Sequence, residues 1–421
     1  MKYIWLFVIL LCGCAGQSFL NVQADYRNVL NISNWPQGIR EGVSLFSDLG
    51  AWHGFAFIPD SVGMAGGFSG PMSMASNYAV GSYTAVASVV VDGVLQEVTN
   101  AIVEKSYFPG RMIQSFTWET LTLTQEIVFV NNRISLLRTR VRNTGGPKEV
   151  KIIYEGSFFT QYFQGQVIDG RTVYLEFPAT KCCFEIEAGE GCHAVVRDGK
   201  YRFETEVRKF GRGEEREDMF VYSAYFNDEP EHVKHPVLEE NPFEESEPFF
   251  EMAAQRWERY IEKLFENKSE LFTNLKYRRI AVKCLMTLMA NWRSAAHDLL
   301  HDGGYPSYWG FSTGFWSWDS WKIAAAIGRW EPELAKDHIR ALFDYQTEEG
   351  MIPDFVSRIK YINNLLELNK TVSFFNIFDY KASKGEIVAT FLAILELIRS
   401  NGLKIKQTKQ FGDIIMYYEE V

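Results

Sequence analysis

The feature that most constrains the fold is a change of hydrophobic period near residue 240. From about 25 to 235 the apolar residues follow patterns typical of strands, and beyond that they recur at helical spacing. Such a chain separates an all-β region from an all-α region. The sequence therefore predicts a β + α two-domain protein, with an antiparallel β-sandwich over 25–237, an acidic linker over 238–251 and a helical domain over 252–421.

Turn signals divide the first region into hairpins. Asp-Gly pairs, which favour two-residue hairpin turns, lie between strand-like runs at 92–93, 169–170 and 198–199. In the stretch 137–142, apolar or β-branched residues alternate with Arg138, Arg140 and Arg142. We therefore expect one buried face and one solvated face that carries the arginines. Many hairpins at short spacing are typical of a large sandwich.

The second region has the spacing of a helical array. We expect helices at 249–266, 274–300, 320–329, 332–348, 384–400 and 408–420. Pro332 suits the first turn of its helix, and Asn401-Gly402 suits a helix end. About six helices are consistent with part of an α/α architecture.

The first residues have the pattern of an export signal over 1–17. Lys2 precedes an apolar run that is too short to span a bilayer, and small residues follow. Leu11-Cys12-Gly13-Cys14 resembles a bacterial lipobox, which would place a lipid on Cys14. The alternative is simple cleavage after Gly16. The sequence thus predicts a protein exported to the periplasm or cell surface, whose contact with a membrane is limited to this anchor.

The charge of the chain excludes one class of partner. The formal net charge is -10 at pH 7 and the isoelectric point is near 5.4. Nucleic-acid binding requires a basic face that neutralises phosphates, so we expect no nucleic-acid partner.

Cysteines suggest one covalent link. Cys182 or Cys183 could face Cys192 across a hairpin that contains Ala-Gly-Glu-Gly, and an oxidising compartment would allow a disulfide there. The pattern does not choose between the two pairings. Cys284, in an apolar helical stretch, is expected in the core.

Tryptophans gather around one carboxylate near residue 319. The stretch 304–330 contains Trp309, Trp316, Trp318, Trp321 and Trp330 around Asp319. Sugar rings bind to aromatic planes beside carboxylate acceptors, so this stretch suggests a carbohydrate site with Lys322 as an added donor. The alternative is an aromatic core in which the aspartate stabilises a helix start.

Several motifs resemble one enzyme family. They are Phe46-Ser47-Asp48-Leu49-Gly50-Ala51-Trp52-His53-Gly54, Gly66-Gly67-Phe68-Ser69-Gly70-Pro71, Trp316-Ser317-Trp318-Asp319-Ser320-Trp321-Lys322, Gln346, and Gly350-Met351-Ile352-Pro353-Asp354. Together they resemble glycoside hydrolase family 63 and, more distantly, trehalases of family 37. The resemblance implies a β-supersandwich followed by an (α/α)6 barrel that hydrolyses α-glucosides or related α-linked sugars with inversion. It also implies that Asp319 and Trp316 bind the sugar, with Trp318, Lys322 and Gln346 as further candidates.

The chain departs from this family beyond Asp354. The family's general acid lies in a Glu-Ser-Gly-x-Asp type motif that 355–421 lacks, and its general base lies later still. The catalytic residues are therefore unidentified, and we expect only part of an (α/α)6 barrel. Two alternatives to a hydrolase are a sugar-binding lipoprotein without catalysis and an inactive gene fragment.

No metal or cofactor is expected. His297 and His301 have the i, i+4 spacing of zinc ligands on a helix, but Asp298 replaces the glutamate of zinc hydrolases and no third ligand is evident. Capping or solvated histidines are the simpler interpretation. Asp344 and Glu348 are likewise more typical of an exposed acidic face than of a catalytic pair.

Overall fold

The computed structural model describes residues 24–38, 44–75, 78–178, 181–266, 269–297, 299–307 and 316–346, together with parts of 350–418. The chain divides into two compact units, one ending at Ala290 and one beginning at Asn291. The predicted export signal and Cys14 lie outside the described residues and stay predictions. The domain linker over 238–251 also stays a prediction. No helix in the described part is long and apolar enough to cross a bilayer.

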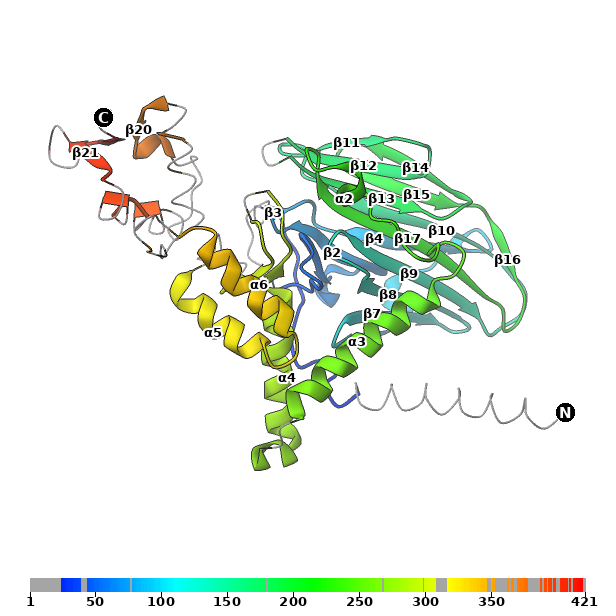
Figure 1. Ribbon diagram of the computed structural model, residues 1–421. Helices are drawn as coiled ribbons and strands as arrows, with labels where there is room; N and C mark the ends of the chain where they lie inside the picture. The colour runs from blue at the N-terminus through cyan, green and yellow to red at the C-terminus, as the bar shows by residue number, and fades with distance from the viewer. Residues whose placement is uncertain are drawn as a thin grey trace. The chain divides into compact units, whose positions relative to one another are not determined.

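The first unit is built on two antiparallel β-sheets (Figure 1). The nine-stranded sheet has the order β1-β2-β4-β10-β15-β14, with β3, β5 and β16 paired to β2, β4 and β10, and the eight-stranded sheet has the order β11-β12-β13-β17-β9-β8-β7-β6. The strands of the first sheet are β1 His53–Phe57, β2 Gly66–Ser73, β3 Tyr78–Ala79, β4 Thr84–Val91, β5 Val94–Leu95, β10 Lys148–Ser157, β14 Cys192–Arg197, β15 Lys200–Thr205 and β16 Arg208–Phe210. Those of the second are β6 Ile102–Phe108, β7 Arg111–Trp118, β8 Leu121–Phe129, β9 Ile134–Asn143, β11 Gln164–Val167, β12 Thr172–Phe177, β13 Cys182–Ala188 and β17 Glu215–Phe226. The predicted antiparallel β-sandwich is confirmed.

Two of the three Asp-Gly pairs form the predicted two-residue hairpin turns, whereas Asp169-Gly170 lies in a longer loop between β11 and β12. Asp92 and Gly93 join β4 to β5 with φ of 49° and 82°, and Asp198 and Gly199 join β14 to β15 with φ of 51° and 75°. Two successive positive φ angles twist a two-residue turn in the sense that matches the twist of the strands. This local chemistry is why the hairpins could be predicted from sequence.

The two sheets face each other across a core that contains paired polar groups. Thr84 on β4 is hydrogen-bonded to the Tyr222 hydroxyl on β17 at 2.6 Å. Tyr154 on β10 donates to Asp218 on β17, also at 2.6 Å. Aromatic rings fill the space between, as where Phe203 and Phe220 lie edge to face at 5.4 Å. Hydrogen bonds between the two sheets thus satisfy these buried polar groups.

Helix α3, Glu247–Phe265, covers part of the second sheet (Figure 1). Phe249, Phe250 and Ala253 pack against apolar side chains of β8, β9 and β17. The prediction that Arg138 lies on a solvated face is therefore wrong. Its guanidinium lies 3.7 Å from the Phe250 ring centroid and donates to Glu126 at 2.6 Å and Glu247 at 2.7 Å. A helix that begins inside the predicted linker, at Glu247, covers this face, and strand alternation alone cannot reveal this.

The remaining elements of the first unit are short, apart from one helix. They are η1 Asp60–Val62, η2 Val98–Asn100, α2 Glu231–Lys234, η3 Glu270–Thr273 and α4 Leu275–Ala290. The helix predicted over 274–300 thus ends at Ala290, because Trp292–Arg293 pairs with Gly303–Gly304 as strands β18 and β19. Cys284, expected in the core, is exposed on α4.

The expected disulfide does not form. Cys182 and Cys183 lie on β13 in the eight-stranded sheet, whereas Cys192 begins β14 in the nine-stranded sheet. The residues between them cross from one sheet to the other instead of forming a hairpin, and all three thiols are free and buried. Burial raises the pKa of the Cys192 thiol to about 12, so it is protonated at neutral pH.

In the second unit, strands β18 and β19 are followed by two packed helices, α5 Ser317–Ile327 and α6 Pro332–Phe343. Near the C-terminus, β20 Thr371–Ser373, η4 Phe375–Ile377, β21 Lys404–Gln407 and β22 Ile414–Tyr417 follow, with sheet order β20-β22-β21. Residues in helical conformation occur before β20, starting at Ile362, and again before β21, ending at Ile398. Strand β22 is antiparallel to both β20 and β21. We call residues 362–417 the C-terminal module.

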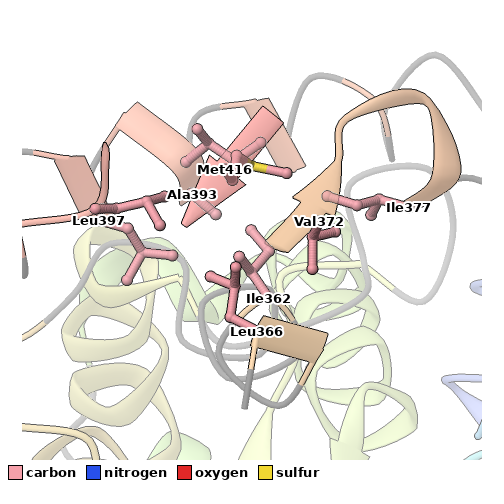
Figure 2. Close-up of a cluster of buried hydrophobic side chains, with 9 residues drawn as sticks. Ile362, Leu366, Val372, Ile377, Ala393, Leu397 and Met416 are labelled. Atoms are coloured by element: carbon pink, nitrogen blue, oxygen red, sulfur yellow. The ribbon is translucent and has the colours of Figure 1, made fainter. Parts of the chain in front are cut away.

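The C-terminal module has its own hydrophobic core (Figure 2). Its buried residues are Ile362, Leu366, Val372, Ile377, Ala393, Ile394, Leu397, Leu403 and Met416. The helix predicted over 408–420 is wrong, because Ile414–Tyr417 forms a strand between the two others. A partial (α/α)6 barrel is accordingly not confirmed.

Candidate functional site

The candidate site lies at the start of α5. Trp316 precedes the helix in extended conformation, with φ -102° and ψ 118°. Its carbonyl accepts hydrogen bonds from the backbone N–H groups of Asp319 at 3.1 Å and Ser320 at 2.9 Å. Asp319 thus lies in the first helical turn, where unpaired N–H groups and the helix dipole favour a negative charge.

Helical spacing divides α5 into two faces. Ser320, Ile323, Ala324 and Ile327 are buried. Gly304 on β19 lies so close to Ile323 that a Cβ atom there would be 3.0 Å from its Cγ2. The opposite face carries Trp318 and Trp321, whose exposed fractions are 57% and 58%. Two exposed indoles one turn apart form an apolar patch, which makes this face of α5 a candidate binding surface.

Lys322 lies beside both exposed indoles. Its Nζ is 5.3 Å from the ring centroid of Trp318 and 5.4 Å from that of Trp321. These distances allow a cation–π interaction with each ring. The two tryptophans and Lys322 form one surface, which we call the indole surface.

The Asp319 carboxylate borders the indole surface. The residue is half-buried, and no hydrogen bond joins its carboxylate to any residue that the structure describes. It therefore does not cap the helix with its side chain, as the core alternative required. Its oxygens keep acceptor capacity for a ligand hydroxyl.

The two other sequence-predicted residues lie elsewhere. Trp316 is 9% exposed, so little of its indole is open to a ligand. Gln346, beyond α6, donates from Nε2 to the Gly350 carbonyl at 2.8 Å. The structure thus brings together Asp319, Trp318 and Lys322 on α5. It adds Trp321, a residue of the same motif for which the sequence predicts no binding role. Trp309, Met351, Pro353 and Asp354 lie outside the described residues.

The two candidate metal histidines do not share a helix. The chain has left α4 before His297, whose φ is +51°. His301 lies 2.7 Å from Asp344, Nδ1 to Oδ2, so this carboxylate and imidazole form a pair within the second unit. The Asp344 carboxylate is therefore paired with His301. Glu348, the other member of the acidic pair, lies outside the described residues.

A buried histidine on α6 makes this region sensitive to acid. His338 is fully buried, and burial lowers its pKa from 6.5 to about 4. Between those two values the unfolded chain binds more protons than the folded one, so stability is complete above pH 6.5 and falls as the pH approaches 4. We expect the free energy of opening of α6, measured by amide hydrogen exchange, to fall by about 3 kcal/mol between pH 6.5 and pH 4. His338→Gln should reduce that slope, and an equal slope in the variant would contradict this assignment.

Comparison with known proteins shows that the sandwich is similar to a glucosidase domain. Residues 40–214 match the family model for the N-terminal domain of the glucosidase YgjK. A solved structure from the human microbiome, named as a kojibiose phosphorylase, aligns over 76% of this chain and 48% of its own length, with a TM-score of 0.51 and 11% identity. At this identity the similarity concerns the fold. The N-terminal part of the chain is therefore glycosidase-like, and family 63 is not singled out.

The C-terminal end matches a different family. Residues 346–418 match the family model for segregation and condensation protein ScpA. The chain is 42% identical over 60 residues to segregation and condensation protein A of Clostridium acetobutylicum, covering 14% of this chain and 23% of that protein. The corresponding protein of Lactococcus lactis subsp. cremoris (strain MG1363) is 31% identical over 94 residues, 21% of this chain and 39% of that protein. The chain thus spans less than half of these relatives.

The second match explains why the helical prediction failed at the C-terminus. The sequence predicts that 355–421 belongs to part of an (α/α)6 barrel, whereas residues 362–417 form the C-terminal module. Two local signals were present: Lys404-Ile405-Lys406 alternates as a strand does, and Gly412 precedes the β-favouring pair Ile414-Ile415. Gly412 also interrupts the helix predicted across it.

Proposed function

We propose that this chain binds α-linked oligosaccharides at the indole surface beside Asp319. The observation that carries the proposal is the pairing of two exposed indoles with a carboxylate that accepts no hydrogen bond from the residues that the structure describes. An indole face covers the C–H face of a pyranose, and a carboxylate accepts hydrogen bonds from its hydroxyls. The sugar class follows from the glucosidase match and from the family 63 resemblance of the Trp-Asp-Ser motif.

We further propose that these 421 residues bind sugar without hydrolysing it. Inverting glycosidases need an acid and a base about 6.5–9.5 Å apart, on opposite sides of the scissile bond. The family's acid motif has no counterpart in 355–421, and that stretch matches ScpA instead. Asp319 would hold the sugar, and inverting hydrolysis would require two carboxyl groups from elsewhere.

The proposal is tested by calorimetry with maltose and kojibiose on the 421-residue chain. We expect Asp319→Ala to weaken binding at least about 10-fold, since a polar anchor in a sugar site contributes roughly 1.5 kcal/mol or more. Trp318→Ala should weaken it several-fold through the lost ring contact. Glu333→Gln, which removes a carboxylate from exposed α6, serves as the matched control and should bind as the parent chain does.

Two outcomes would contradict the proposal. Equal affinity in Asp319→Ala and the parent chain would remove the carboxylate from the site. Release of glucose from either disaccharide by the purified chain, lost in a heat-denatured control, would replace a binding function with a hydrolytic one.

A further inference from the structure

A pocket lies in the first unit, and its lining residues are far in sequence from the indole surface. It has a volume of about 290 Å³ and lies between the end of β8 and α3. Its lining includes Phe129, Val130, Phe249, Met252, Arg256 and Arg259. Binding pockets for small molecules are about 300–1,000 Å³, so this one is at the small end of that range.

The floor of the pocket is apolar and rigid. Phe129 is fully buried and packs edge to face on Phe46, with ring centroids 5.0 Å apart. Phe249 is 3% exposed and belongs to the core beneath α3. Because protein covers these two rings almost completely, the apolar surface open to a ligand comes mainly from Met252, which is 47% exposed, and from the partly exposed Val130.

One arginine of the pocket is neutralised and fixed. Asp48, fully buried, accepts hydrogen bonds on Oδ2 from Arg256 at 2.6 Å and from the Trp257 indole at 2.7 Å. Its Oδ1 accepts from the Leu49 N–H at 2.8 Å. The Arg256–Asp48 pair therefore adds no net charge to the pocket, although it fixes one wall.

The other arginine is an uncompensated cation. Arg259 is exposed one turn further along α3, and no carboxylate that the structure describes lies within salt-bridge distance of it. The lining contains no acidic residue. The pocket thus combines an apolar floor with one net positive charge, and guanidinium groups bind planar carboxylates through two parallel hydrogen bonds.

We propose that this pocket binds a small monocarboxylate with an apolar body, such as an aryl-alkanoate. The single net charge favours a monoanion, since Asp48 behind Arg256 disfavours a dianion such as a phosphate monoester. The apolar body lies against Met252 and Val130, above the buried rings of Phe129 and Phe249, and the carboxylate meets Arg259 at the rim. This inference does not depend on carbohydrate binding, because no residue is shared with the indole surface.

The test is ligand-observed NMR on the full chain with 3-phenylpropionate and its neutral analogue 3-phenylpropanol. We expect the acid to bind with a Kd on the order of 1 mM and at least about 10-fold more tightly than the alcohol. Arg259→Met should abolish that preference. Gln255→Glu, which places a carboxylate in the exposed lining, should weaken the acid about 10-fold and leave the alcohol unchanged.

Lys283→Met on exposed α4 removes one positive charge away from the pocket and is the control. It should leave both Kd values within about 2-fold, since a distant exposed charge is screened. Equal binding of acid and alcohol, an undiminished preference in Arg259→Met, or no binding up to the solubility limit of the acid would each overturn the proposal.

Discussion

Replacing Asp48 with asparagine will lower the free energy of unfolding of the first unit by about 3 kcal/mol. The buried carboxylate holds the Arg256 guanidinium and the Trp257 indole through one oxygen, at 2.6 and 2.7 Å. Asparagine keeps the shape but removes the charge, which leaves an arginine that is 13% exposed without its partner. Urea unfolding followed by tryptophan fluorescence measures the change.

The matched control is Asp60→Asn. Asp60 pairs with Lys105 at 2.6 Å, but its side chain is 80% exposed, so water replaces the lost partner. We expect a change within about 0.5 kcal/mol. Equal effects of the two substitutions would show that burial of the Asp48 pair contributes nothing to the stability of the sandwich and α3.

Leu397→Ala will unfold the C-terminal module or bring it close to unfolding. Leu397 is fully buried among the nine residues of the module's core (Figure 2). Truncating a buried leucine costs about 2–5 kcal/mol, and a domain of this size has little more than that in total. Hydrogen exchange over residues 362–417 should approach that of an unfolded chain, while residues 24–290 keep their protection.

Leu395→Ala, two residues away on the same helical stretch, provides the comparison. Leu395 is 46% exposed, so its replacement by alanine removes far less buried area than Leu397→Ala does. The free energy of unfolding should therefore change by less than about 0.5 kcal/mol. Loss of protection that spread equally into 24–290 after Leu397→Ala would contradict independent folding of the module. Intact protection of 362–417 would contradict its core.

Local chemistry explains which parts of the fold could be predicted. The hairpins at Asp92-Gly93 and Asp198-Gly199 follow from residues that tolerate positive φ. Helix α3 follows from apolar spacing over almost its whole length, 247–265. Failures occurred where a distant segment decided the outcome. Arg138 is buried because α3 covers it, and Cys192 pairs into the other sheet, away from Cys182 and Cys183.

At the candidate site, the sequence determined the residue types and the helix start, because indole spacing and an acid in a first turn are local properties. It also predicted that the β-sandwich precedes the long helix α3. Only the tertiary structure decided that Trp318 and Trp321 are exposed while Trp316 is buried, because burial depends on which neighbours cover each face of α5. It likewise decided that residues 362–417 close around their own core, because strand pairing between β20 and β22 joins residues some forty positions apart.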